Sequence, residues 1–294
     1  MKKILLLFIS SLLLLSGCNP PLESEKLIVY TSFYVMEDFA KKIAGPYAEV
    51  KTLMPSNGEI HDYEPTTRDL VNLTNADLFI YNGANLEHFI KQLEEVMNEE
   101  NPSLVFVNST KSVNLLEEDQ LIDPHTWLSP LNAKKQIEEI KNAFVLIDEK
   151  HSSYYNEQYN KFAIEFDKLH ELYKIFLENG KGRYLVTSHA AFGYLTSAYD
   201  LIALPIGSLH SEEEPTQQNI AHVIEIVNTY EIPYIYAESN APSNAVITVL
   251  EETNAQLEIL YTLENLSEEQ IKRNADYFSI MKDNLLAIAK GLCK

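Results

Sequence analysis

Two kinds of apolar pattern alternate along the chain, and together they predict alternating strands and helices. Short runs rich in β-branched residues, such as residues 27–31, are typical of buried strands, whereas longer segments with one apolar face, such as residues 86–97, are typical of helices. Strands are expected at residues 27–31, 50–54, 77–81, 104–107, 184–187 and 232–237. Helices are expected at residues 34–44, 66–75, 86–97, 129–147, 190–199, 216–230, 241–252 and 267–290. This alternation predicts the α/β class with mainly parallel sheets.

Capping and turn residues indicate several of the helix boundaries. Gly45-Pro46 is expected to end the first helix, and Ser129-Pro130 is a favourable start for another. Ser267-Glu268-Glu269-Gln270 has the spacing of a capping box, which predicts the start of a final helix that reaches about Lys290.

One segment is longer than the rest and contains no helix breaker. Residues 151–179 include neither proline nor glycine and are rich in Tyr, Phe, Leu, Glu and Lys. As one helix they would extend ~43 Å at ~1.5 Å per residue, enough to cross a whole domain. We therefore predict two (βα) lobes, residues 27–150 and residues 181–294, joined by a long rigid linking helix at residues 151–180.

The first residues predict export and lipidation. Lys2 and Lys3 precede an apolar run from Ile4 to Leu15, which is too short for a membrane span of ~20 residues and is typical of a signal peptide. The following Leu15-Ser16-Gly17-Cys18 resembles the lipobox of bacterial lipoproteins, in which the cysteine is acylated. We predict a signal peptide at residues 1–17, a lipid on Cys18, a tether at residues 18–26, and attachment to the extracytoplasmic face of the cell membrane.

Charge and cysteine content narrow the choice of partners. The formal net charge of −20 at pH 7 opposes binding to phosphate backbones, so no nucleic-acid partner is expected. The second of the two cysteines is Cys293, which has no partner if Cys18 is acylated. We therefore expect no disulfide framework and no role for Cys293.

Three of the eight histidines are candidates for metal ligation. His88, His151, His170, His210 and His222 are expected to be structural or surface residues. His61, His125 and His189 each fall in a loop at or near the start of a predicted helix, and such loops line the ligand crevice of open α/β sheets. The residues alone are compatible either with one shared metal site or with separate capping or solvent-facing histidines.

The segments around these three histidines resemble the metal-binding loops of the zinc/manganese solute-binding lipoproteins of metal ABC transporters, the cluster A-I family. The resemblance extends over about residues 27–290. It rests on His61-Asp62-Tyr63-Glu64-Pro65-Thr66, Asp123-Pro124-His125-Thr126-Trp127-Leu128-Ser129-Pro130, Ser188-His189-Ala190-Ala191-Phe192-Gly193-Tyr194-Leu195, Glu212-Glu213-Glu214-Pro215-Thr216, Tyr236-Ala237-Glu238 and the closing helix from Asp276-Tyr277 to Leu286.

The resemblance implies a metal site in the cleft between two lobes. His61 and His125 would come from the N-terminal lobe and His189 from the C-terminal lobe. The fourth ligand of zinc-type members is a carboxylate from a Pro-Leu-Glu-like loop, which here reads Thr262-Leu263-Glu264 and makes Glu264 the candidate. Glu238 and a water molecule are the alternatives for this position.

The predicted ligand set favours zinc. Three imidazoles and one carboxylate can complete a tetrahedral Zn²⁺ site, whereas sites richer in carboxylate suit Mn²⁺, which is the alternative metal. Manganese-type relatives usually carry glutamate at the position of His189. The resemblance therefore implies a monomeric protein that captures Zn²⁺ as a transported ligand and delivers it to the permease of an ABC importer.

Two other functions are alternatives to metal delivery. A surface adhesin is the main alternative, because an anchored exterior protein is suitably placed for adhesion. A zinc hydrolase is less favoured, because Pro65 directly follows His61-x-x-Glu64 and the chain lacks both a Gly-x-Ser-x-Gly elbow and a glycine-rich phosphate loop. We expect that the protein is not an enzyme.

Overall fold

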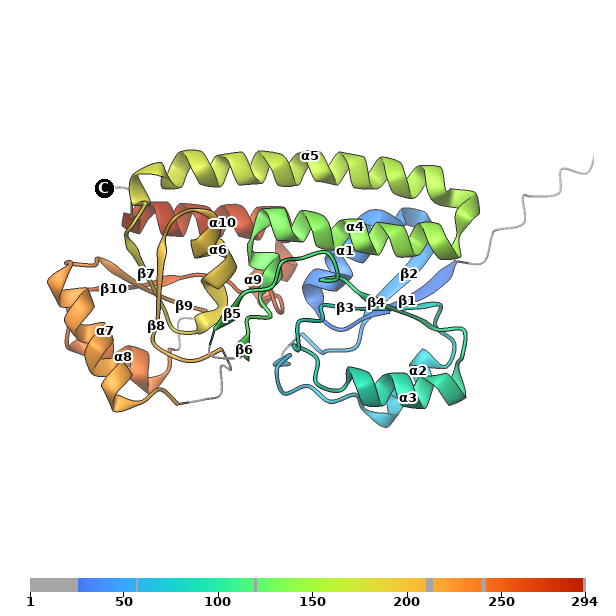
Figure 1. The fold of residues 1–294 in the computed structure, drawn as a ribbon, viewed down its shortest axis with the longest axis horizontal. Coiled ribbons are helices and arrows are strands. Elements are labelled where there is room, and N and C mark those ends of the chain that lie inside the picture. Colours follow the sequence, from blue (N-terminus) through green and yellow to red (C-terminus); the bar gives the residue numbers. More distant parts are fainter. Residues whose placement is uncertain (1–25, 57, 119–120, 210–213, 239–241, 293–294) are drawn as a thin grey trace, which may run out of the picture.

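The computed structural model describes residues 26–56, 58–118, 121–209, 214–238 and 242–292. Within these ranges the chain forms two four-stranded sheets that lie side by side, with a layer of long helices along one side of both (Figure 1). The predicted signal peptide, Cys18, His210 and Cys293 lie outside the described residues.

The N-terminal sheet consists of β1 (Leu27–Thr31), β2 (Ala48–Thr52), β3 (Leu78–Tyr81) and β4 (Val105–Asn108). Its order is β2-β1-β3-β4, and every pair is parallel. Because side chains alternate across a strand, one face packs on α1 (Tyr34–Ala44) and α4 (Pro130–Ile147), and the other packs on α2 (Thr67–Leu73) and α3 (Ile90–Glu100). The sheet is therefore the middle layer of three.

The C-terminal sheet repeats this arrangement with β7 (Tyr184–Thr187), β8 (Ile202–Pro205), β9 (Tyr234–Ala237) and β10 (Gln256–Ile259). Its order is β10-β9-β7-β8, again with parallel pairs. One face packs on α6 (Gly193–Ala198) and α10 (Tyr277–Leu292), and the other on α7 (Gln217–Thr229) and α8 (Asn244–Glu251). Both sheets therefore carry helices on their two faces.

Helix α5 (Ser152–Leu177) joins the two halves. Its 26 residues span ~39 Å at ~1.5 Å per residue, and it lies along α4 at one end and α10 at the other (Figure 1). The buried Tyr173 hydroxyl donates to the Met281 carbonyl of α10 at 2.7 Å, while the Tyr155 hydroxyl donates to Asp148 Oδ2 at 2.6 Å. These contacts confirm the predicted fold class of two parallel-sheet lobes joined by a long helix.

Two predicted helices have different boundaries in the structure. The capping box at Ser267 is present, but it opens the short helix α9 (Glu268–Lys272), and the chain turns at Asn274 with φ +50° before α10 begins. Asparagine is among the residues that tolerate this left-handed conformation. Similarly, Ala84 and Asn85 have φ values of +53° and +63°, so α3 begins at Ile90 rather than at residue 86. The final predicted helix is thus two helices, and the third is shifted.

Within the described ranges, no helix combines the length and apolar character that crossing a membrane requires.

Candidate metal centre

The fold brings the three candidate histidines together from loops that are far apart in the sequence. His61 lies in the loop after β2, His125 directly precedes the 3₁₀ turn η2 (Thr126–Leu128), and His189 follows β7. Their exposed fractions are 6%, 0% and 4%, respectively. Loops at the carboxyl ends of parallel strands commonly form ligand sites, and here they place buried imidazoles from both lobes in one cluster.

The candidate ligand Glu264 lies beside two of these histidines. The Nε2 atoms of His61 and His125 are 3.2 Å apart, and one ring nitrogen from each of the three histidines lies within 4.8 Å of the others. Glu264 Oε1 lies 3.6 Å from His125 Nε2 and 3.9 Å from His61 Nε2. The three histidines therefore form one cluster between the lobes, and Glu264 lies against two of them.

The spacing of these donors fits a small tetrahedral cation. Two atoms that are each ~2.0–2.1 Å from the centre of a tetrahedron lie about 3.3 Å apart, close to the shorter of these separations. Glu264 Oε1 is buried and has no hydrogen-bond partner among the described residues. Burial, reinforced by the negative charges of Glu238 and Glu59, raises the pKa of Glu264 well above its usual range. A buried carboxylate in this setting is costly unless a cation or donor compensates it, and a metal ion would do so.

Asp123 orients His125. Its Oδ1 atom lies 2.8 Å from His125 Nδ1 and also accepts the His125 backbone N–H at 2.9 Å. This hydrogen bond directs His125 Nε2 toward the other donors, as carboxylates commonly do for metal-binding histidines. Asp123 belongs to the sequence motif that carries His125, but the sequence alone does not indicate this role.

Glu238 plays the corresponding part for His189. Its Oε1 atom lies 3.0 Å from His189 Nδ1, and its Oε2 atom accepts a hydrogen bond from the Thr262 hydroxyl at 3.1 Å. Both carboxylate oxygens are therefore engaged by protein groups, whereas Glu264 Oε1 faces His61 and His125 with no hydrogen bond from the part of the chain that the structure describes. This difference favours Glu264 over Glu238 as the fourth ligand.

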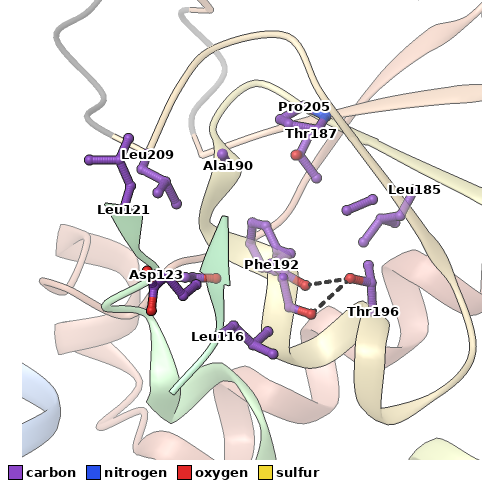
Figure 2. Close-up of a pocket in the computed structure, with 13 residues that line it drawn as sticks. Leu116, Leu121, Asp123, Leu185, Thr187, Ala190, Phe192, Thr196, Pro205 and Leu209 are labelled. Carbon is purple, nitrogen blue, oxygen red and sulfur yellow. Dashed lines mark hydrogen bonds between the residues drawn. The ribbon is translucent and has the colours of Figure 1, made fainter. Parts of the chain in front are cut away.

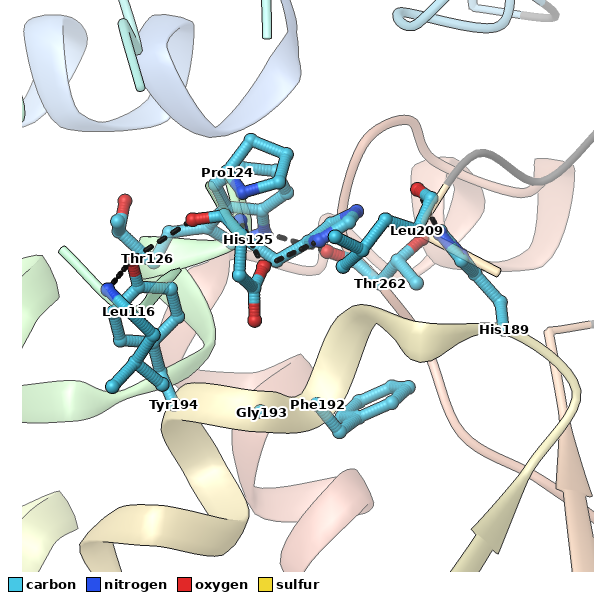
Figure 3. A network of polar contacts seen from close by, with 12 residues as sticks. Leu116, Pro124, His125, Thr126, His189, Phe192, Gly193, Tyr194, Leu209 and Thr262 are labelled. Carbon is cyan, nitrogen blue, oxygen red and sulfur yellow. Dashed lines mark hydrogen bonds and ion pairs between the residues drawn. The ribbon is translucent and has the colours of Figure 1, made fainter. Parts of the chain in front are cut away.

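The surroundings of His189 favour its doubly protonated, positively charged form in the metal-free protein. Its Nε2 atom contacts the Leu209 carbonyl at 3.0 Å (Figure 3). Because Nδ1 contacts Glu238, both ring nitrogens face hydrogen-bond acceptors. Burial lowers the pKa of His189, but hydrogen bonding to Glu238 and its negative charge outweigh burial and raise the pKa to about 9. Metal binding at Nε2 consequently requires loss of a proton and separation from the Leu209 carbonyl.

Hydrogen bonds from both lobes hold the site loops together. The buried Trp127 indole donates to the Thr262 carbonyl at 2.7 Å, and the Tyr277 hydroxyl donates to the Trp127 carbonyl at 2.7 Å. The Tyr194 hydroxyl donates to the Asp123 carbonyl at 2.8 Å and accepts the Leu116 N–H at 2.8 Å (Figure 3). The donor cluster is therefore braced by direct contacts between the two halves.

A buried amide network supports the His125 loop from the N-terminal lobe. Asn82 donates through Nδ2 to the Pro124 carbonyl at 2.9 Å, and its Oδ1 atom accepts from Gln136 Nε2 at 2.8 Å and from the Thr126 hydroxyl at 3.2 Å. Buried amides satisfied in this way restrict the conformations of the loops that they bridge. Asn82 thereby fixes the backbone on both sides of His125.

A cavity of about 460 Å³ lies beside the donor cluster, between the C-terminal sheet and the hairpin of β5 (Glu117–Glu118) and β6 (Leu121–Ile122). Figure 2 shows Leu116 and Leu121 on one side of it, and Ala190 and Phe192 on the other. Its lining includes Asp123, yet of the described residues neither the three histidines nor Glu264 line it. The largely apolar cavity is thus separate from the metal donors.

One further donor was not identified from the sequence. Glu59 groups with His61 and Glu264 in a second set whose ligand atoms lie within 4.8 Å of one another. Its position two residues before His61, in the same loop, is the signal that could have indicated it.

Two α/β lobes joined by a long helix, with candidate metal ligands contributed by both lobes, are the features of a solute-binding protein for metal ions. Residues 29–291 match the family model described as zinc-uptake complex component A, periplasmic, and the chain belongs to this family. Residues 1–19 match the prokaryotic membrane lipoprotein lipid attachment site, which confirms the predicted lipoprotein character and location at the membrane surface. Acylation of Cys18 itself stays a prediction.

Individual relatives agree with this assignment. The high-affinity zinc uptake system protein ZnuA of Bacillus subtilis is 33% identical over 92% of this chain and 89% of its own length. The Zn(II)-bound ZnuA-like domain of Streptococcus pneumoniae AdcA has a TM-score of 0.80 at 30% identity, covering 92% of this chain and 100% of that chain. The laminin-binding protein Lmb of Streptococcus agalactiae, described as bifunctional with adhesin and metal-transporting activity, has a TM-score of 0.83 at 27% identity over 91% of this chain and 100% of that one.

Proposed function

We propose that this lipoprotein captures one Zn²⁺ ion with His61, His125, His189 and Glu264 and delivers it to the permease of an ABC importer. The observation that carries the proposal is the cluster of three buried imidazoles beside the buried Glu264 Oε1, which lies 3.6 Å and 3.9 Å from two of them and has no hydrogen bond among the described residues. The zinc uptake and zinc-binding relatives supply the identity of the ion. The lipid on Cys18 would keep the protein at the extracytoplasmic face, where it would act as a monomer.

The division of ligands between lobes suggests how the ion is held and released. His61 and His125 belong to the N-terminal lobe, whereas His189 and Glu264 belong to the C-terminal lobe. Binding ties the two lobes together, and a permease that moved them apart would remove ligands from the ion. An affinity near nanomolar corresponds to about −12 kcal/mol, so such a partner must offset a large binding free energy.

The donor set favours zinc transport over zinc catalysis. A catalytic zinc usually keeps an open coordination position for water, whereas four protein donors would close this site. A hydrolase would also need a general base, and Glu238, the carboxylate that could serve as one, is hydrogen-bonded to His189 and Thr262. We therefore infer that the protein is not an enzyme, and hydrolytic turnover by the zinc-loaded protein would contradict this. Adhesion stays an alternative that matrix binding by a variant lacking the three histidines would favour.

The direct test is metal titration of the soluble form, residues 19–294. We expect one Zn²⁺ per chain by elemental analysis, with nanomolar affinity in competition with a fluorescent chelator. Mn²⁺ should bind much more weakly, because imidazole-rich sites favour zinc and manganese prefers oxygen donors. Equal or tighter Mn²⁺ binding would overturn the assignment of the ion, and absence of a saturable site would overturn the proposal.

Glu264→Gln tests the fourth ligand. If about 12 kcal/mol is shared among four donors, each contributes about 3 kcal/mol, and zinc affinity should fall roughly 100-fold or more. Glu238→Gln is the matched control, with an expected loss of about tenfold because it removes a group that orients a ligand. Loaded with Co²⁺, Glu238→Gln should retain the visible spectrum of a tetrahedral site, whereas Glu264→Gln should show an altered spectrum. The opposite ranking of the two variants would make Glu238 the ligand.

A further inference from the structure

The second donor set overlaps the proposed zinc site but extends toward solvent. Glu59, His61 and Glu264 offer ligand atoms that all lie within 4.8 Å of one another. Two of the three also belong to the inner set of three histidines and Glu264. Glu59 is partly exposed, whereas every inner donor is buried. The chain therefore offers an outer and an inner set of donors that share His61 and Glu264.

Local hydrogen bonds hold Glu59 beside this pair. The His61 backbone N–H donates to Glu59 Oε1 at 3.3 Å, which keeps the carboxylate against its own loop. Asn265 Nδ2 donates to the Gly58 carbonyl at 3.0 Å, which joins the loop of Glu59 to the loop of Glu264 across the two lobes. Between these loops lies Glu264 Oε1, which is 4% exposed as a residue and has no hydrogen bond in the described part of the chain. A cation bound to this oxygen would lie within reach of both donor sets.

We propose that Glu59, His61 and Glu264 form an outer capture site for a divalent cation, from which the ion passes into the inner site. The inference rests on the proposed function, since the inner site must be a zinc site. The two carboxylates attract a dication, and the partly exposed Glu59 is the one nearer to solvent, from which the ion arrives hydrated. Transfer then keeps His61 and Glu264 bound while His125 and His189 replace Glu59, so the ion always retains two protein ligands.

The two sets also differ in their preference for metals. One imidazole and two carboxylates accept oxygen-preferring cations as well as zinc, whereas three imidazoles and one carboxylate favour zinc. Capture is therefore fast and permissive, and selection takes place on transfer to the inner site. Once the ion is in the inner site, Glu59 no longer contacts it. Glu59 therefore lowers the free energy of the transition state for binding and not that of the bound state. Removing Glu59 must then slow association and dissociation by the same factor and leave Kd unchanged.

The experiment measures both rate constants of the soluble protein with Zn²⁺ by stopped flow, with a chelator challenge for dissociation. In Glu59→Gln both constants should fall by at least about fivefold, an increase of ~1 kcal/mol in the barrier, while Kd changes by less than about twofold. Asp62→Asn is the matched control, because Asp62 is an exposed acidic residue next to His61 that belongs to neither donor set. Its rates should stay close to those of the unmodified protein.

A second variant isolates the outer site. His125→Ala/His189→Ala keeps Glu59, His61 and Glu264, and should retain weak Zn²⁺ binding that addition of Glu59→Gln abolishes. Faster dissociation and weaker Kd in Glu59→Gln alone would make Glu59 a resident ligand and overturn the capture role. Unchanged rates, or equal slowing in Asp62→Asn, would also overturn it. Absence of tight zinc binding in the unmodified protein would instead refute the proposed function, so the two failures are distinguishable.

Discussion

Replacement of His61, His125 and His189 by alanine should abolish tight zinc binding while leaving the fold intact. The three imidazoles supply three of the four proposed donors, and Glu264 alone cannot compensate for the desolvation of Zn²⁺. If each ligand contributes about 3 kcal/mol of a nanomolar affinity, removing three costs about 9 kcal/mol, a loss of roughly 10⁶-fold. Competition titration with a chelator, together with elemental analysis of the purified variant, would measure it.

The matched control is His88→Ala/His222→Ala, which removes two exposed histidines in other parts of the two lobes. This control should keep one tight zinc per chain, because neither side chain belongs to a donor group that the described residues form. Circular dichroism should show the same helix content for both proteins, since the three site histidines lie in loops. Retained tight binding in the triple variant would refute the ligand assignment and leave the family membership and lipid anchor unaffected.

The parts of the fold with continuous apolar runs could be predicted from the sequence. Strands β1, β3, β7 and β9 are the central strands of their sheets and consist largely of apolar residues, so the pattern identified them almost to the residue. Strands β8 and β10 were missed because each forms a sheet edge and is partly exposed, which dilutes the apolar signal. The break at Asn274 was missed because the pattern of apolar positions in the sequence gives no sign that this residue adopts a left-handed conformation.

The site could be predicted only as far as its motifs extend. The three histidine motifs identified the imidazole donors, and the position of Glu264 in its loop made it a candidate. The choice between Glu264 and Glu238 depends on which carboxylate oxygen lacks a hydrogen bond, and such three-dimensional information is absent from the sequence. The proximity of Glu59 to Glu264 likewise arises from the docking of the two lobes.

Zinc affinity should fall steeply as the pH is lowered from 7.5 to 5.5. The pKa of His189 in the metal-free protein is raised to about 9, so this histidine is protonated throughout that range and zinc must displace its proton. The release of one proton makes the apparent affinity change about tenfold per pH unit, or roughly 100-fold over the interval. Burial also raises the pKa of Glu264 well above its usual range, so displacement of its proton would steepen the dependence.

The measurement is a chelator competition at pH 5.5, 6.5 and 7.5, corrected for protonation of the chelator. Calorimetry in buffers of different ionisation enthalpy would count the released protons directly. Glu238→Gln provides the control, because loss of the carboxylate next to His189 Nδ1 should lower the pKa of His189 and reduce proton release near pH 7.5. An affinity that stayed constant between pH 7.5 and 5.5 would contradict ligation by His189, because no zinc–imidazole bond can form at a nitrogen that keeps its proton.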